Sequence, residues 1–324
     1  MPIARLLRWL AQVLLVAACA AASAQDRFPL KPIQVVVPFS PGTATDILAR
    51  MFAPKLAERL GQSVVVQNRI GAGGTLGTQA VASAPADGYT LLMVNSSHAI
   101  NPTLYTRLPY DSQRDFAGIA LVAESAYLIV ASPHAGVKNL KELVGAAKQK
   151  PGKIHYASAG LGTATHLAGA YFTQLAGIDL VHVPYKNTAD YVSDLLAGRI
   201  EITFAPTAFL LQHIKDGKLL ALGVSTPEPM RSPLEVPSVR EAAGIGYEFI
   251  AWFGLLAPAK TPPAVMETLS KSMRAIVESG VLSEDYRKIG MSARNVALTD
   301  FDTYVKRDMD LLGPFVKASG ARAD

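Results

Sequence analysis

Cysteine is almost absent from this sequence. The only one among its 324 residues is Cys19, which lies in the N-terminal segment 1–24. A mature chain cut after Ala24 has none. Such a chain forms no disulfide, has no thiol nucleophile and holds no cysteine-ligated metal or iron–sulfur cluster.

Clustered positive charge and long apolar runs are also missing. The net charge is +5 and the pI is near 9.2, but Arg5 and Arg8 of the N-terminal segment supply two of these charges. The other basic residues are scattered, without a Lys/Arg run or a basic–aromatic stripe, so we do not expect nucleic acid as a partner. Beyond the N-terminus no stretch approaches the roughly 18 apolar residues of a membrane-spanning helix.

Metal and catalytic motifs are missing as well. The run Gly71–Gly77 lacks the full dinucleotide-binding fingerprint and a partner acid, and no G-x-S-x-G elbow occurs. We therefore expect no metal, no cofactor and no enzymatic activity. An exported α/β hydrolase built on Ser97-His98 or on Ser158 stays open as an alternative. The six histidines show no H-E-x-x-H or paired ligand spacing; they are His98, His134, His155, His166, His182 and His213.

The N-terminus has the features of a secretory signal peptide. Arg5 and Arg8 precede an apolar run over 10–22, and Ala22-Ser23-Ala24 fits a small-x-small cleavage site. This predicts a signal peptide over 1–24 and an exported, soluble mature protein. Lipid attachment at Cys19, in a sequence similar to a lipobox, is the alternative.

What dominates the remaining chain is a short β-branched strand, a turn rich in Gly, Ser and Thr, and then a helix. This alternation predicts parallel α/β sheets covered by helices on both faces. The last third changes character, with an apolar strand-like run over 247–256 and a final helix that Thr299 caps. The other expected strands cover 33–39, 63–67, 90–94, 154–158, 180–183, 200–204 and 219–224.

Three of the strand-to-helix turns share one composition: Ser40–Thr43, Gly71–Thr75 and Ser158–Thr163. In parallel α/β sheets, ligands bind at the carboxyl ends of strands beside helix N-termini. Free N–H groups there attract anions, glycine permits close approach, and hydroxyls donate hydrogen bonds to carboxylates. A single turn of this kind is a weak signal, but three together indicate an anion site.

Several segments in order resemble the Bug family, the periplasmic solute-binding proteins of tripartite tricarboxylate transporters. The resemblance covers essentially the whole mature chain. It rests on Val36-Val37-Pro38-Phe39-Ser40-Pro41-Gly42, Gly71-Ala72-Gly73-Gly74, Asp87-Gly88-Tyr89-Thr90, Tyr156-Ala157-Ser158-Ala159-Gly160, Val183-Pro184-Tyr185-Lys186 and Trp252-Phe253-Gly254.

The resemblance implies a two-domain periplasmic-binding-protein-like α/β fold of type II, each domain a mainly parallel sheet flanked by helices. Domain 1 would be discontinuous, comprising 25–125 and 248–324, and domain 2 would cover 126–247. Such a protein is expected to be a periplasmic monomer that closes over a small carboxylate and delivers it transiently to membrane transporter subunits. A ligand-loaded sensor for a signalling receptor is a second alternative.

Carried over by position, the resemblance also implies a set of ligand-binding residues. Two positions depart from the family pattern, because Thr43 and Asn187 stand where the family commonly has glycine. The implied residues are Phe39, Pro41, Gly42, Thr43, Gly73, Gly74, Thr75, Ser96, Ser97, Ala159, Gly160, Thr163, Tyr185 and Trp252.

Overall fold

A computed structural model of the chain describes residues 28–161, 163–318 and 322. The expected signal peptide, its cleavage site and Cys19 lie outside the described residues. No helix in the described part of the chain is both long and apolar enough to cross a membrane.

The described chain alternates strands and helices along most of its length. The strands are β1 (Ile33–Val37), β2 (Val64–Asn68), β3 (Thr90–Asn95), β4 (Phe116–Ala131), β5 (His155–Ser158), β6 (Val181–Pro184), β7 (Ile202–Pro206), β8 (Leu220–Val224), β9 (Ile250–Pro258) and β10 (Ser292–Ala297). The helices are α2 (Ala44–Leu60), α3 (Thr75–Ala82), α4 (Ser97–Leu104), α5 (Leu140–Gln149), α6 (Ala164–Ala176), α7 (Thr188–Leu196), α8 (Thr207–Lys215), α9 (Val239–Ala243), α10 (Pro263–Glu278), α11 (Ser283–Lys288) and α12 (Thr299–Ala318), with 3₁₀ turns η1 (Ala72–Gly74) and η2 (Pro133–Ala135).

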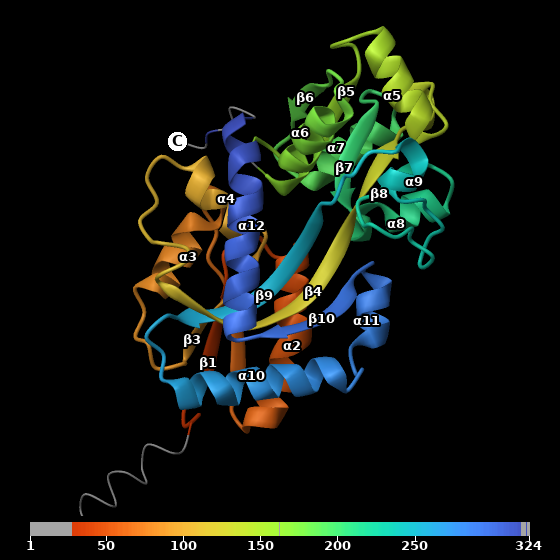
Figure 1. The fold of residues 1–324 in the computed structure, drawn as a ribbon. Coiled ribbons are helices and arrows are strands. Elements are labelled where there is room, and N and C mark those ends of the chain that lie inside the picture. Colours follow the sequence, from red (N-terminus) through yellow and green to blue (C-terminus); the bar gives the residue numbers. More distant parts are fainter. Residues whose placement is uncertain (1–27, 162, 319–321, 323–324) are drawn as a thin grey trace, which may run out of the picture.

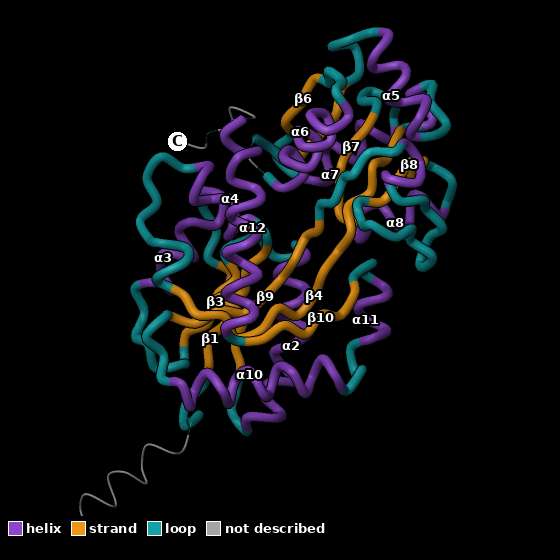
Figure 2. Tube along the Cα trace, viewed as in Figure 1, coloured by secondary structure: helices purple, strands orange, loops and turns teal. Residues whose placement is uncertain are grey.

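Two lobes are joined by two long strands. Figure 1 shows one lobe around β1, β3, α2, α10 and α12 and the other around β5 to β8, with β4 and β9 running between them. The strands form one hydrogen-bonded path, β2-β1-β3-β9-β4-β7-β5-β6, and β8 and β10 also pair with β4. Figure 2 shows β4 and β9 continuing from one lobe into the other.

Strand β4 changes its partners where it passes from one lobe to the other. Residues Phe116 to Ala126 pair with β9, and the same half of the strand pairs with β10. From Tyr127 to Ala131 the partner is β7, with β8 on the other side. One strand therefore belongs to the sheets of both lobes.

The pairing is mixed rather than parallel throughout. The expected parallel pairing occurs in β2-β1-β3 and in β6-β5-β7, whereas β9, β4, β8 and β10 pair antiparallel. β4 and β10 were not among the predicted strands. β4 is buried along most of its length, so its sequence is mostly apolar, interrupted by Glu124 and Ser125, and lacks the alternation that marks a half-exposed strand.

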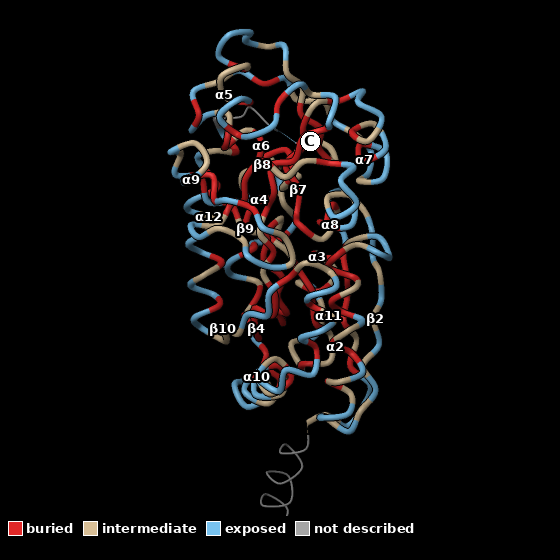
Figure 3. The backbone as a smooth tube through the Cα atoms, turned by 90° about the vertical axis from the view of Figure 1, so that its right-hand side faces the viewer, coloured by how far each residue is buried: buried red, intermediate tan, exposed pale blue. Residues whose placement is uncertain are grey.

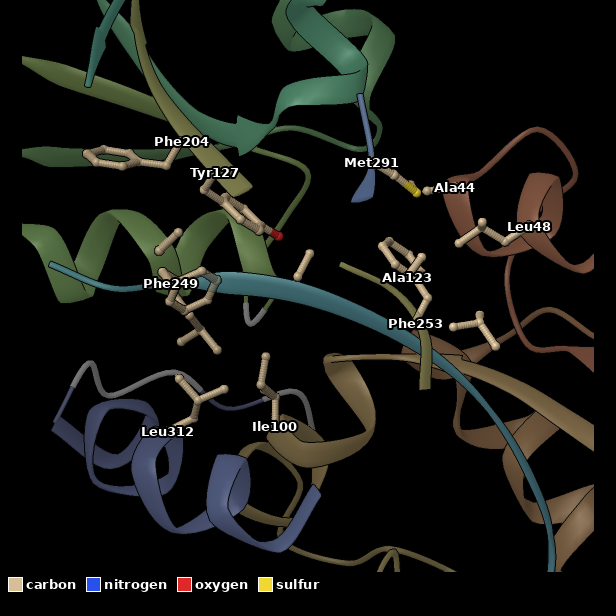
Figure 4. Close-up of a cluster of buried hydrophobic side chains, with 14 of the residues drawn as sticks. Ala44, Leu48, Ile100, Ala123, Tyr127, Phe204, Phe249, Phe253, Met291 and Leu312 are labelled. Atoms are coloured by element: carbon tan, nitrogen blue, oxygen red, sulfur yellow. The ribbon is translucent and has the colours of Figure 1, made fainter. Parts of the chain in front are cut away.

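The hydrophobic core follows β4 and β9 through both lobes. Figure 3 shows buried segments along the centre of the molecule. Figure 4 shows the main cluster, with Leu48 of α2 at one end and Phe204 of β7 at the other. A second cluster, on the other face of β9, holds Trp252 against Phe301 of α12.

Helix α12 extends from one lobe to the other beside these strands. It packs on α4 and β4 and also contacts α6, where the rings of Phe315 and Tyr171 lie 4.1 Å apart. The final helix is thus a contact between the lobes in addition to the two strands.

Candidate functional site

The principal cleft has a volume of about 1000 Å³ and lies between the turns of one lobe and two helices of the other. The β1–α2 and β2–α3 turns form the first wall, and the β6–α7 turn, α7 and α8 form the second. The lining residues are Pro38, Phe39, Ser40, Pro41, Gly42, Thr43, Ile70, Gly71, Ala72, Gly73, Gly74, Ala159, Lys186, Asn187, Thr188, Ala189, Val192, Ser193, Leu196, Phe209 and His213.

Buried Asp46 fixes the shape of the first turn. Its carboxylate accepts hydrogen bonds from the Gly42 N–H at 2.9 Å, from Arg50 Nε at 3.0 Å and from Asn68 Nδ2 at 2.8 Å. Burial raises the pKa of Asp46, but the hydrogen bonds from Arg50, Gly42 and Asn68 outweigh it, so this pKa lies below its ordinary value. Asp46 is therefore a structural anion beneath the turn.

Thr43 is the N-cap of α2, but its side chain does not cap the helix. Its hydroxyl donates to the backbone oxygen of Ser40 at 2.8 Å. A hydroxyl has one proton to donate, so the turn itself uses this donor. The first N–H groups of α2 have no intrahelical acceptor, and they remain the donors that this turn offers a ligand.

The second turn has a left-handed backbone over four consecutive residues, Gly71, Ala72, Gly73 and Gly74, all with positive φ. Tyr105 packs beneath it and donates its hydroxyl to the Ala72 carbonyl at 2.8 Å. A Cβ atom at Gly73 would lie 2.5 Å from the Tyr105 oxygen. The positive φ therefore favours glycine at position 73, and a Cβ atom there would require the Tyr105 hydroxyl to shift.

The third predicted turn, Ser158–Thr163, bonds mainly to itself. Thr163 caps α6 through a contact with His166 N–H, and its hydroxyl donates to the Gly160 carbonyl at 2.7 Å. The Ala159 N–H donates to Thr165 Oγ1. Among the described residues of this turn, Ala159 alone lines the cleft.

The second wall begins with Lys186 and Asn187. Asn187 caps α7 by accepting from the Asp190 N–H at 3.0 Å, and Lys186 is exposed beside it. Lys186 is the only lysine or arginine among the described lining residues, and none of those residues is Asp or Glu. Lys186 is therefore the one charged lysine, arginine, aspartate or glutamate side chain among the described residues that line the cleft.

The structure brings half of the predicted site residues to this cleft: Phe39, Pro41, Gly42, Thr43, Gly73, Gly74 and Ala159. The other half, Thr75, Ser96, Ser97, Gly160, Thr163, Tyr185 and Trp252, are not among its lining residues.

The two aromatic residues of this second half, Trp252 and Tyr185, are held away from the cleft by hydrogen bonds to carboxylates. Trp252 is fully buried, and its Nε1 donates to Asp308 of α12 at 2.6 Å. Its backbone N–H donates to Ser96 Oγ, which is buried too. Tyr185 donates its hydroxyl to Asp194 at 2.9 Å. Neither ring contributes to the wall of the cleft.

Sequence reasoning missed the helical part of the second wall. Ala189, Val192, Ser193 and Leu196 of α7 line the cleft, as do Phe209 and His213 of α8. Their spacing of three and four residues indicates one face of each helix, but it does not reveal that this face meets a ligand site. Lys186 lies directly after Tyr185, in one of the segments that resemble the Bug family.

A serine–histidine contact lies below the third turn. Ser158 Oγ is 2.6 Å from His182 Nε2, and His182 stacks on His166 with ring centroids 4.0 Å apart. Burial, together with the His166 charge, lowers the pKa of His182 to about 4. Ser158 has no exposed surface, so no substrate reaches its hydroxyl in this arrangement. The described residues contain no group of three or more side chains able to hold a metal ion.

The chain is similar in sequence to a known family of receptors. Residues 48–321 match the sequence profile of the family described as "Tripartite tricarboxylate transporter family receptor". Protein BugT of Bordetella pertussis is 35% identical over 295 residues, which cover 90% of both chains.

Solved structures agree in fold. The periplasmic binding protein BugD superposes with a TM-score of 0.79 at 32% identity, over 91% of this chain and 99% of that one. R. palustris Rpa4515, solved with adipate, gives a TM-score of 0.82 at 30% identity, over 91% and 99%. MatC of Rhodopseudomonas palustris, solved with bound malate, gives 0.79 at 27% identity, over 89% and 100%. The α/β binding-protein fold class expected from the resemblance is confirmed.

Proposed function

The chain belongs to the tripartite tricarboxylate transporter family of receptors, and from that premise we propose that it binds a carboxylate in the cleft between its two lobes. The observation that supports this proposal is that the cleft offers a cation and backbone N–H donors but no acidic side chain among its described lining residues. Lys186 supplies a cation, the N-termini of α2 and α7 supply backbone donors, and no described lining residue is an acid. Helix N-termini and lysine both stabilise bound anions.

The proposed domains follow the partner change of β4. Domain 1 comprises 25–125 and 248–324, and domain 2 comprises 126–247. In support, β4 exchanges β9 for β7 after Ala126, and the chain returns into β9 at Ile250. We propose that bending at these two crossings closes the cleft on the ligand.

The proposed cellular role is delivery of the ligand to membrane transporter subunits by a periplasmic monomer. A signal peptide over 1–24 would direct export, with cleavage after Ala24 rather than lipid attachment at Cys19. A sensor that docks on a signalling receptor would use the same closed form, so ligand binding alone does not separate the two roles.

Catalysis is not part of the proposal. The best candidate nucleophile, Ser158, is completely buried, and its hydroxyl also contacts the Gly160 carbonyl at 3.0 Å. An α/β hydrolase requires a nucleophile that the substrate can reach. The chain's membership of a receptor family supports the same conclusion.

A thermal-shift screen followed by calorimetric titration tests the proposed function. Small mono- and dicarboxylates should raise the melting temperature, whereas neutral sugars should not. A ligand at about a hundred times its Kd adds about 2.7 kcal/mol to the free energy of unfolding. If only sugars or metal ions shift the transition, the carboxylate function is wrong.

Matched lysine variants sharpen the test. Lys186→Gln should weaken carboxylate binding about tenfold or more, since a hydrogen bond to a charged group contributes roughly 1.5–3 kcal/mol. Lys141 is exposed on α5 and does not line the cleft, so Lys141→Gln should bind as the wild type does. Equal weakening in both variants would assign the effect to net charge instead of the cleft.

A further inference from the structure

The left-handed turn between β2 and α3 contains one residue that is not glycine. Residues 71–74 all have positive φ, and Ala72 among them has a φ of 45°. In the described part of the chain, the other non-glycine residue with positive φ is Leu298. This conformation is strained for a residue with a Cβ atom, and it persists only where surrounding structure holds it. Ala72 lines the cleft, so the contact that holds it bears on the shape of the first wall.

Tyr105 provides this contact. Its hydroxyl donates to the Ala72 carbonyl oxygen at 2.8 Å. Its own backbone is fixed at the C-terminus of α4, where its N–H donates to the Asn101 carbonyl at 3.0 Å, and Figure 1 shows α3 and α4 in the same lobe. A residue at the end of a helix thus restrains the peptide group that joins Ala72 to Gly73.

The orientation of this peptide group determines where the Gly73 N–H points. A peptide bond before a residue other than proline is trans, so its N–H and its C=O point in opposite directions. The Ala72 carbonyl points to Tyr105, which does not line the cleft and instead lines a different cavity with Pro102 and Tyr110. Ala72 and Gly73 both line the cleft. The Gly73 N–H therefore points away from Tyr105 and its cavity.

We propose that Tyr105 is a positioning residue for carboxylate binding: its hydroxyl holds the peptide between Ala72 and Gly73 so that the Gly73 N–H faces the cleft and donates to the bound carboxylate. The inference rests on the proposed function, which supplies the ligand. The next N–H of the turn, that of Gly74, already donates to the Gly71 carbonyl at 3.0 Å. Tyr105 itself lies outside the lining of the cleft and acts through the turn.

Calorimetric titration with succinate and malate tests this role in the wild type, Tyr105→Phe, Ala72→Gly and the double variant. Tyr105→Phe keeps the ring and removes the hydroxyl. Ala72 then relaxes to negative φ, and the ligand has to restore the strained conformation, so binding should weaken about fivefold, or about 1 kcal/mol. In the Ala72→Gly background the same change should weaken binding about twofold or less, because glycine adopts positive φ without strain.

Tyr89→Phe is the matched control. Tyr89 is also half-buried, its hydroxyl accepts from the Leu30 N–H at 2.8 Å, and it does not line the cleft. This variant likewise loses one hydrogen bond between a hydroxyl and the backbone, and it should bind both acids as the wild type does. A crystal structure of ligand-free Tyr105→Phe is a second measurement, in which Ala72 should have negative φ.

The outcomes separate the two proposals. If Tyr105→Phe binds both acids as the wild type does, or weakens binding equally in both backgrounds, the positioning role is wrong, although the carboxylate function stands. Positive φ at Ala72 in the Tyr105→Phe crystal would overturn the role as well. If the wild type binds neither acid, the positioning role is rejected, and the proposed function also fails if no acid in a wider carboxylate screen binds.

Discussion

Asp308 of α12 offers a quantitative test of the contact between this helix and β9, the strand that joins the lobes, because its half-buried carboxyl accepts a hydrogen bond from Trp252. Burial raises its pKa from 3.8 to about 6, even though Trp252 donates a hydrogen bond to it. One pKa unit corresponds to about 1.4 kcal/mol, so the charged form costs the folded state about 3 kcal/mol. That cost is absent below the unfolded pKa, grows as the pH rises, and is complete above the folded pKa.

Asp308→Asn removes this titration and keeps an oxygen that accepts from Trp252. The free energy of unfolding of the wild type should therefore fall by about 3 kcal/mol relative to the variant between about pH 4 and about pH 7. An unpaired amide N–H costs roughly 1–3 kcal/mol at every pH, so the variant should be the less stable protein in acid and should at least match the wild type at about pH 7.

Urea unfolding at both pH values, followed by tryptophan fluorescence, measures this difference. The matched control is Asp310→Asn, because Asp310 is exposed on the same helix and forms an ion pair with Lys306 four residues away. Such a pair contributes roughly 0.3–0.5 kcal/mol, so this variant should follow the wild-type profile. If Asp308→Asn also runs parallel to the wild type, Asp308 is hydrated and the reasoning fails.

Three further predictions concern the first wall of the cleft. Asp46→Asn should lower the free energy of unfolding, measured by urea titration, by about 2 kcal/mol. The pKa of Asp46 is lowered in the folded protein, so the wild type loses this stabilisation as the carboxylate becomes protonated, and the difference between the two proteins should shrink as the pH falls through that pKa. Gly73→Ala should weaken carboxylate binding in calorimetry because its Cβ meets Tyr105, whereas Gly136→Ala, with positive φ but open space, should cost only stability. Thr43→Ser should bind as the wild type does, since the hydroxyl donates within the turn; selective loss for one ligand would contradict this.

The sequence predicts the first wall of the cleft well because local signals determine it. Gly42, Gly73 and Gly74 all have positive φ, a requirement that glycine meets without strain. Parallel strands end at a common edge, so the turns that follow β1 and β2 converge without any knowledge of distant contacts. The parallel halves of both sheets followed from the same alternation of strand and helix.

The directions of the predicted site side chains Trp252 and Tyr185 were less predictable, because they depend on which side of an element faces the cleft. Along β9, Trp252 belongs to one core cluster and its neighbour Phe253 to the other, and a register shift of one residue would exchange them. Both neighbours are large and aromatic, so composition does not choose between them. Tyr185 and Lys186 pose the same problem in a turn, where a contact with Asp194 turns the tyrosine away.

The connection between the lobes depends on a residue that no local pattern singles out. Ser225 has no exposed surface, and its hydroxyl accepts from the Tyr127 N–H at 2.8 Å and donates to the Phe249 carbonyl at 2.5 Å. One side chain thereby ties β4 to the segment that leads into β9, at the point where both cross between the lobes. A motion that separated the two crossings would leave buried backbone groups unpaired, at roughly 1–3 kcal/mol for each group. Closure of the cleft is therefore least costly when both crossings bend together as one unit.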